Sequence, residues 1–257
     1  MKIGILEAGL INDKLKHRFD PYPLVFERFL GRAGADLDVQ AFSVVRGEFP
    51  ASIKDCDGWL ITGSRHGAYE NTDWMQRLED FVRQLAAAEA PLVGICFGHQ
   101  IIAQALGGEV VKSDKGWGIG LHSYRLEQEY SWMQQTPAQV GIYAFHQDQV
   151  VKCPPGAQVF ASSDFCPIAG LSYGESIISL QAHPEFEAEY EFALLDLYQG
   201  NIVPDDVALA ARQSMETGKL ADSQLLAQWL GQFLISRQRP EQALPGSRKT
   251  AAAQSSG

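Results

Sequence analysis

The sequence lacks the features that mark several classes of protein. Only four of its 257 residues are cysteine, and no two of them form a Cys-x-x-Cys pair, which excludes zinc-ribbon and thioredoxin-type motifs. Four scattered cysteines in a chain of this length do not make a disulfide scaffold, so a reducing compartment is expected. The sequence also has no run of about 18 apolar residues, the length needed to cross a membrane.

Positive charge is scarce as well. The chain has 21 lysines and arginines against 31 aspartates and glutamates, a formal net charge of -10. An acidic protein repels phosphate backbones, so nucleic acid is not expected as a partner. The first residues lack both the apolar core and the cleavage site of a signal peptide. We therefore expect a cytoplasmic protein with no nucleic-acid or membrane partner.

The apolar pattern predicts an α/β fold. In the first hundred residues, strand-like segments alternate with helical ones, which is typical of a parallel sheet covered on both faces. The strands are expected at 2–7, 37–44, 57–62 and 91–95, and the helices at 23–33, 74–88 and 98–106. Six further strands without long helices between them predict an antiparallel extension of the sheet, at 109–112, 120–126, 140–145, 158–163, 168–172 and 176–180. Helices are expected again at 187–198, 205–215 and 223–235.

These segments predict one domain over residues 1–235. Residues 236–257 are rich in Arg, Pro, Ser, Gly and Ala, and such a segment cannot bury enough apolar surface to order itself. We expect it to be a disordered tail, with no synthetase domain fused to this chain.

The sharpest motif is Gly94-Ile95-Cys96-Phe97-Gly98, between an apolar strand and a helix. It is the cysteine counterpart of the G-x-S-x-G nucleophile elbow. Glycines on either side remove the Cβ atoms that would clash in so tight a turn, and the positive end of the helix favours thiolate over thiol. A cysteine in an apolar stretch is usually a core residue, but the glycines and the strand-to-helix position favour a nucleophile.

A thiol nucleophile needs a base, and the base needs a group that orients it. His183-Pro184-Glu185 follows a strand-like segment, so His183 is expected at a strand end, with Glu185 reaching back to its ring. Most His-x-Glu pairs are incidental, and some bind metals. A zinc site would need a further His or Cys nearby, and the sequence has none at ligand spacing. We therefore predict no metal and no other cofactor.

The two motifs together, with Gly98-His99-Gln100 in the first and Ala182 and Phe186 flanking the second, resemble the class I glutamine amidotransferase family. The resemblance covers about residues 1–235. It implies a flavodoxin-like fold with a central, mostly parallel sheet, and a catalytic triad of Cys96, His183 and Glu185. Such a triad would cleave glutamine or a γ-glutamyl amide through a γ-glutamyl thioester, releasing glutamate and either ammonia or an amine.

The resemblance also implies where the substrate is held. The backbone N–H of Gly63, or of its immediate neighbour, and that of Phe97 would form the oxyanion hole, although Gly63-Ser64 alone would pass for an ordinary strand-ending turn. Four residues are carried over as substrate contacts: Gln100, His146, Gln147 and Asp148. Asp148 fits a loop cap equally well. Of the other histidines, His17, His99 and His122 are expected on the surface or in structural roles, as is His66, although its loop follows Gly63.

Within the family, the sequence is similar to a free-standing branch that includes γ-glutamyl peptidases and GMP-synthase-like amidotransferases. Shared segments include residues 62–66, 115–120 and 145–149. The turn at Gly63 lacks the consecutive glycines of GMP synthetase glutaminases, which argues against a dedicated role of that kind. Two alternatives remain open: a glutaminase subunit that acts in trans with a synthetase partner, and a non-catalytic, redox-sensing protein of the same fold. The intact triad argues against the latter.

Overall fold

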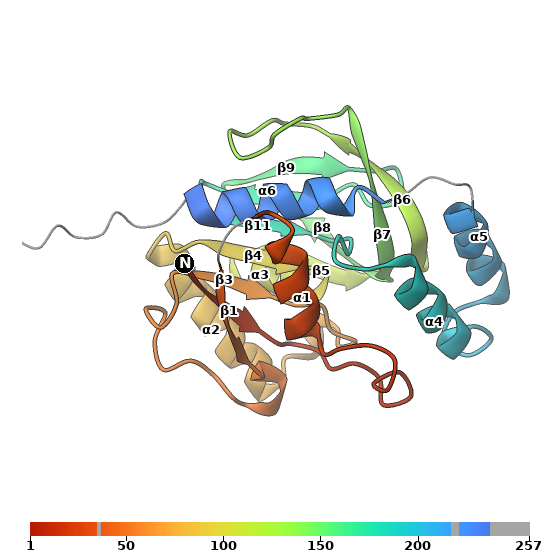
Figure 1. The fold of residues 1–257 in the computed structure, drawn as a ribbon, viewed down its shortest axis with the longest axis horizontal. Helices are drawn as coiled ribbons and strands as arrows, with labels where there is room; N and C mark the ends of the chain where they lie inside the picture. Colours follow the sequence, from red (N-terminus) through yellow and green to blue (C-terminus); the bar gives the residue numbers. More distant parts are fainter. Residues whose placement is uncertain (35–36, 217–220, 237–257) are drawn as a thin grey trace, which may run out of the picture.

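A nine-stranded mixed sheet organises the molecule (Figure 1). The computed structural model describes residues 1–34, 37–216 and 221–236, and the statements below concern these residues. In spatial order the strands are β2 (Asp38–Phe42), β1 (Lys2–Leu6), β3 (Gly58–Ile61), β4 (Leu92–Ile95), β11 (Ile177–Leu180), β10 (Gly170–Tyr173), β9 (Ala157–Ser162), β6 (Gly118–Leu126) and β7 (Gln139–His146).

The sheet has a parallel core and an antiparallel extension, as predicted. The first five strands in this order pair in parallel, and the pairs from β11 through β10, β9 and β6 to β7 are antiparallel. Parallel neighbours need long crossover connections, and the helices of the first hundred residues supply them. The strands from β6 to β11 are joined without helices among the described residues, and such connections permit antiparallel pairing instead.

Helices cover both faces of the parallel core. On one face α1 (Tyr22–Gly31) and α6 (Ser223–Ser236) pack over a cluster that contains Leu60. On the other face α2 (Asp73–Ala87) and α3 (Phe97–Ala105) pack over Trp59 and Ile61. Successive residues of β3 therefore point to opposite faces, both of them apolar, because the strand is buried on both sides.

Two further helices lie beside the antiparallel extension (Figure 1). These are α4 (Ala188–Tyr198) and α5 (Asp205–Glu216), and α5 packs directly on β6. A Cβ atom on Gly120, whose φ is +92°, would lie 2.9 Å from Ala211 Cα, so the close contact requires glycine. Short 3₁₀ turns are η1 (Val44–Arg46) and η2 (Ala68–Glu70). In the described part of the chain, no helix combines the length and apolarity needed to cross a membrane.

One prediction about the sheet is wrong. The strand at 109–112, β5 (Glu109–Lys112), does not join the main sheet but pairs with β8 (Asp148–Lys152) in a separate two-stranded sheet. The strand β8 was not predicted: the chain leaves the main sheet at Gln147, the one residue between β7 and β8. The expected tail at 236–257 lies outside the described residues, except for Ser236, the last residue of α6.

Candidate active site

Cys96 occupies a strained turn between β4 and α3. Its φ of 53° and ψ of -101° lie in a region that non-glycine residues rarely adopt. A Cβ on Gly94 would lie 2.5 Å from Ile102 Cδ1, and a Cβ on Gly98 would lie 2.4 Å from the carbonyl oxygen of Ile61. Neither distance is compatible with a side chain. The packing of α3 against β3 and β4 therefore explains both glycines of the motif.

His183 and Glu185 form a buried pair just after β11. The Nδ1 atom of His183 lies 2.7 Å from Oε1 of Glu185, and both side chains are almost fully buried. The His183 backbone N–H donates to the Tyr143 carbonyl at 2.7 Å. The ring stacks on Phe186, with 3.9 Å between the centroids and 10° between the planes. These contacts fix the ring, and the bond to Glu185 assigns its proton to Nδ1.

Charge stabilises the protonated ring. Burial alone would lower the pKa of His183, but the Glu185 carboxylate and the Cys96 sulfur outweigh it and raise that pKa well above its usual range. An imidazolium beside the sulfur is therefore favoured, which is the arrangement that supports a thiolate nucleophile. For two other cysteines burial outweighs a nearby lysine, Lys2 or Lys115, and raises the pKa of Cys56 to about 11 and that of Cys166 to about 12.

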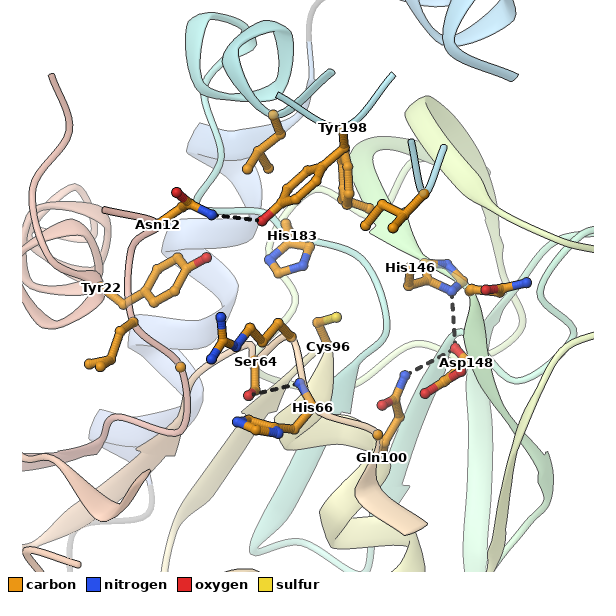
Figure 2. Close-up of a pocket in the computed structure, with 18 of the residues that line it drawn as sticks. Asn12, Tyr22, Ser64, His66, Cys96, Gln100, His146, Asp148, His183 and Tyr198 are labelled. Atoms are coloured by element: carbon orange, nitrogen blue, oxygen red, sulfur yellow. Dashed lines mark hydrogen bonds between the residues drawn. The ribbon is translucent and has the colours of Figure 1, made fainter. Parts of the chain in front are cut away.

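Cys96 and His183 open into one cavity of about 760 Å³ (Figure 2). All four predicted substrate contacts also line it: Gln100, His146, Gln147 and Asp148. Gln100 is held in place by two hydrogen bonds from its Nε2, at 3.0 Å to the Asp148 carbonyl and at 3.2 Å to Oε1 of Gln181. The structure therefore brings Cys96 and Gln100 of the first motif and His183 of the second to one cavity.

His146 and Asp148 differ in how they face this cavity. The Nδ1–H of His146 donates to the Asp148 carbonyl at 3.2 Å, and burial lowers the pKa of His146 to about 3, so the ring is neutral. The carboxylate of Asp148 is half-buried and accepts a hydrogen bond from Tyr69 at 3.2 Å. Burial raises its pKa. Asp148 begins β8, so it does not cap a loop.

Of the two predicted oxyanion residues, one adjoins His183 and the other adjoins Cys96. A Cβ on Gly63 would lie 2.8 Å from Cε1 of His183, so the turn after β3 touches the imidazole and only glycine fits there. Phe97 is the first residue of α3, directly after Cys96. The loop after β1 also packs tightly against this turn, because a Cβ on Gly9 would lie 2.5 Å from the Gly63 carbonyl oxygen. Donation from these two N–H groups to a substrate stays a prediction.

Several residues of the site were missed in the sequence. Gln181 is fully buried, and its Nε2 lies 3.7 Å from the Cys96 sulfur. It stands two residues before His183, and extended-chain alternation would place both side chains on one side, a signal that could have identified it. The aromatic side chains of Trp117 and Tyr198 also line the cavity, but they come from distant segments without a shared motif.

The other histidines of interest have separate environments. His99 is fully buried, with its Nδ1 2.8 Å from the Ser179 hydroxyl and its Nε2 3.1 Å from the Ile168 carbonyl, which fits a structural role. His66 lines the cavity, and its Nδ1 lies 2.9 Å from the Glu70 carboxylate. Over the described ranges, no group of three or more His, Cys, Asp or Glu side chains could hold a metal ion.

Comparison with known proteins shows the family of the chain. The family model described as "Glutamine amidotransferase class-I" matches residues 26–192. Gamma-glutamyl peptidase 3 of Arabidopsis thaliana is 31% identical over 85% of this chain and 90% of its own length. A glutamine-hydrolyzing GMP synthase subunit of Archaeoglobus fulgidus is 29% identical over 62% of this chain and 83% of its own length.

Solved structures show the same fold. A glutamine amidotransferase from Methylobacillus flagellatus superposes with a TM-score of 0.71 at 22% identity, covering 98% of each chain. One from Thermotoga maritima gives a TM-score of 0.70 at 18% identity, over 93% of this chain and 97% of that one. The matches confirm the predicted fold class, and they confirm that the protein is an enzyme of the hydrolytic or amidotransferase type. The chain belongs to the class I glutamine amidotransferase family.

Proposed function

We propose that this enzyme hydrolyses glutamine or a γ-glutamyl amide, with Cys96 as nucleophile, His183 as acid and base, and Glu185 as the group that orients His183. One observation carries the proposal. A cysteine on a strained strand-to-helix turn shares a cavity with a buried histidine whose Nδ1 lies 2.7 Å from a carboxylate. Nucleophile, base and orienting acceptor are the three parts that covalent amide hydrolysis needs.

The reaction proceeds in two halves. The thiolate of Cys96 attacks the γ-carbonyl carbon, and the resulting C–N bond cleavage leaves a γ-glutamyl thioester. The imidazolium of His183 gives its proton to the departing nitrogen, so ammonia or an amine leaves neutral. The imidazole then takes a proton from water, the hydroxide attacks the thioester, and glutamate and the free thiol are released. These steps require no cofactor.

Backbone N–H groups would stabilise the charge that develops on the carbonyl oxygen. Gly63 and Phe97 supply them in this proposal, because one touches the His183 ring and the other directly follows Cys96. Removal of one such donor typically costs about 3 kcal/mol of transition-state stabilisation. Gln181 adds a further N–H toward the sulfur itself, with its Nε2 3.7 Å away.

A second candidate function follows from the relatives. Two archaeal glutamine-hydrolyzing GMP synthase subunits, from Archaeoglobus fulgidus and Sulfolobus acidocaldarius, are 29% and 30% identical to this chain. A trans-acting glutaminase would pass its ammonia to a synthetase partner, and its activity would depend on that partner.

Direct assay of glutamate release separates these functions. The purified protein is given glutamine, γ-glutamyl-glycine and γ-glutamyl-phenylalanine, first alone and then with a synthetase of the GMP synthase type and its substrates. We expect glutamate release by the protein alone. Release that begins only when the synthetase is added would support the trans-acting glutaminase, and no release under either condition would overturn both.

A further inference from the structure

The cavity is larger than free glutamine needs. At about 760 Å³ it falls in the range of sites that enclose drug-sized ligands, roughly 300–1,000 Å³. Cys96 and His183 are two of the many residues that line it, so a glutamine bound for attack would leave much of the space empty. The lining of the remaining space therefore indicates what else the substrate carries.

The cavity has two halves of different character. The polar half is lined by charged and polar side chains from the loop after β3 and from β5 and β8, namely Arg65, His66, Glu70, Lys112 and Asp148. The apolar half is lined mainly by aliphatic and aromatic side chains from the loop after β1, β7, α4 and the adjoining loops, namely Leu10, Ile11, Trp117, Phe145, Tyr198 and Ile202. Asn12 and Asp13 of the loop after β1 are polar residues that also line the cavity. In Figure 2, His183 and Tyr198 lie on one side of Cys96, and Gln100 and Asp148 on the other.

Three aromatic rings form the wall of the apolar half. Phe145 lies between the other two, with its centroid 5.7 Å from that of Trp117 and 6.0 Å from that of Tyr198. The Tyr198 hydroxyl accepts a hydrogen bond from Nδ2 of Asn12 at 3.2 Å (Figure 2). This bond joins the end of α4 to the loop after β1, so the wall is built from segments 186 residues apart.

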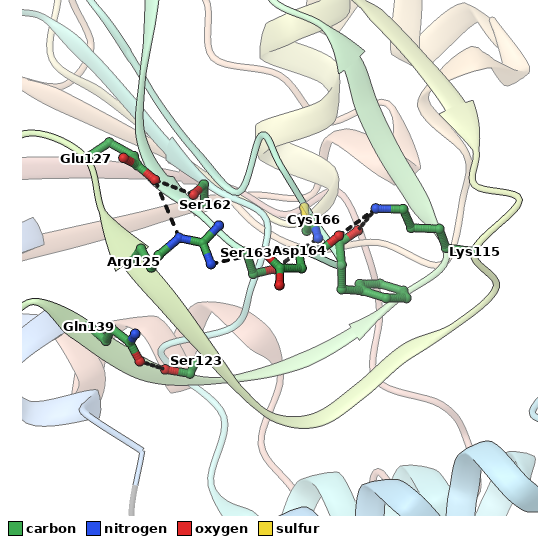
Figure 3. Close-up of polar contacts among 10 residues, drawn as sticks. Lys115, Ser123, Arg125, Glu127, Gln139, Ser162, Ser163, Asp164 and Cys166 are labelled. Carbon is green, nitrogen blue, oxygen red and sulfur yellow. Dashed lines mark hydrogen bonds and ion pairs between the residues drawn. The ribbon is translucent and has the colours of Figure 1, made fainter.

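The loop that carries Trp117 is fixed from outside the cavity. The Lys115 ammonium donates to the carbonyls of Asp164 and Phe165, at 2.6 and 3.1 Å (Figure 3). Arg125 holds the same turn through the Asp164 carboxylate at 3.0 Å. A partly exposed tryptophan held in this way is a preformed binding surface, because little side-chain or loop freedom is lost when a ligand packs on it.

We propose that the apolar half binds the leaving-group side of a γ-glutamyl substrate, and that this side carries an aromatic or bulky apolar group. The substrate class is then γ-glutamyl peptides and amides of apolar amines, rather than free glutamine. This inference rests on the proposed function.

Charge decides which end of the substrate enters which half. The γ-glutamyl group has an α-ammonium and an α-carboxylate, and only the polar half offers both acidic and basic partners for them. The amine side of the scissile bond must face His183, which protonates the nitrogen as the C–N bond breaks and the C–S bond to Cys96 forms. Beyond His183 the substrate meets Tyr198 and the apolar wall.

Two matched substrates test the inference. γ-Glutamyl-phenylalanine and γ-glutamyl-glycine share the same scissile amide and differ in one apolar side chain, so the ratio of their kcat/KM values isolates the apolar half. Burial of a phenylalanine side chain predicts a ratio of about tenfold or more in the wild type. Trp117→Ala should bring the ratio close to one. Ile202→Ser, at an exposed position where folding is not at risk, should lower it about threefold.

Leu209→Ser is the matched control. Leu209 is an exposed aliphatic residue on α5 that does not line the cavity, so its substitution should leave the ratio unchanged. A wild-type ratio near one, or a high ratio that neither cavity variant lowers, would overturn the inference. In that case the proposed function would still stand, provided that γ-glutamyl-glycine and glutamine are hydrolysed. Absence of glutamate release from every substrate would overturn both.

Discussion

The two sides of the candidate active site are held in place by different forces. On the nucleophile side, steric packing fixes Cys96, because Gly94 and Gly98 bring the backbones of β4, α3 and β3 into direct contact. On the base side, buried charge fixes His183. The Glu185 carboxylate lies 2.7 Å from its Nδ1 and raises its pKa. Steric packing does not depend on pH, whereas buried ionisable groups do. The two sides should therefore respond differently to substitution and to pH.

The largest loss of activity is expected for substitution of Cys96, the nucleophile of the proposed reaction. Cys96→Ala removes the nucleophile and should lower kcat by at least about a thousandfold in a glutamate-release assay, at every pH. Cys153→Ala is the control, because Cys153 does not line the cavity, and it should retain activity. Substantial turnover by Cys96→Ala would show that another group performs the attack.

Gly98→Ala tests the steric side. Its Cβ would lie 2.4 Å from the Ile61 carbonyl oxygen, so the variant should lose about 3 kcal/mol of unfolding free energy, equally at pH 6 and pH 8. Gly31→Ala is the matched control: apart from its chain neighbours and the backbone of its own helix, no atom of the described residues lies within 4 Å of the position its Cβ would take, and we expect a change below about 1 kcal/mol. Urea unfolding measures both. Equal stabilities for the two variants would contradict the steric account.

Glu185→Gln tests the charged side. The Glu185 carboxylate is the largest influence that raises the pKa of His183, so its removal should lower that pKa and shift the alkaline limb of the pH–rate profile to lower pH. The rate at neutral pH should fall by about tenfold to a hundredfold, less than for Cys96→Ala, since the amide still accepts from Nδ1. A reduced rate with an unshifted profile would limit Glu185 to an orienting role.

Glu191 concerns stability rather than turnover. It is fully buried on α4, accepts the Gly120 N–H at 3.1 Å, and burial raises its pKa to about 8. The folded state thus retains a proton that the unfolded state releases above about pH 4.5. This contribution to stability is fully present below pH 4.5 and is lost as the pH rises toward 8, at up to about 1.4 kcal/mol per pH unit.

Glu191→Gln keeps the acceptor and removes the titration. Its stability relative to the wild type should therefore rise steadily from pH 5 to pH 8 in urea unfolding. A difference between the two proteins that stays constant over this range would show that Glu191 does not titrate there.

Local sequence was sufficient for the features that local geometry controls. The spacing of Gly94, Cys96 and Gly98 predicts a strand–turn–helix elbow because only glycine permits the close backbone contacts around it. The spacing of His183 and Glu185 also predicts their contact, since only Pro184 separates them. In the structure a turn, in which the Phe186 N–H donates to the His183 carbonyl at 3.3 Å, brings Glu185 back to the ring. The parallel core followed from the alternation of strands and helices.

Features that depend on tertiary contacts were not predictable in this way. β5 pairs with β8 instead of the main sheet because the chain changes sheets at Gln147, which no periodicity marks. The aromatic wall joins Trp117, Phe145 and Tyr198 from three separate elements, and each residue alone fits a core position equally well. Sequence therefore predicted that Cys96 and His183 would lie together, whereas the shape of the space beside them required the structure.

Covalent labelling tests the central claim most directly. The protein is incubated with a γ-glutamyl analogue that carries a thiol-reactive diazoketone in place of the amide, and the adduct is located by peptide mass mapping. A single adduct at Cys96 is predicted, with Cys56, Cys153 and Cys166 unmodified because burial raises the pKa of each of these thiols. His183→Ala should slow the labelling. An adduct at one of the other three cysteines, or no adduct at Cys96 in the active protein, would contradict the assignment of Cys96 as the nucleophile.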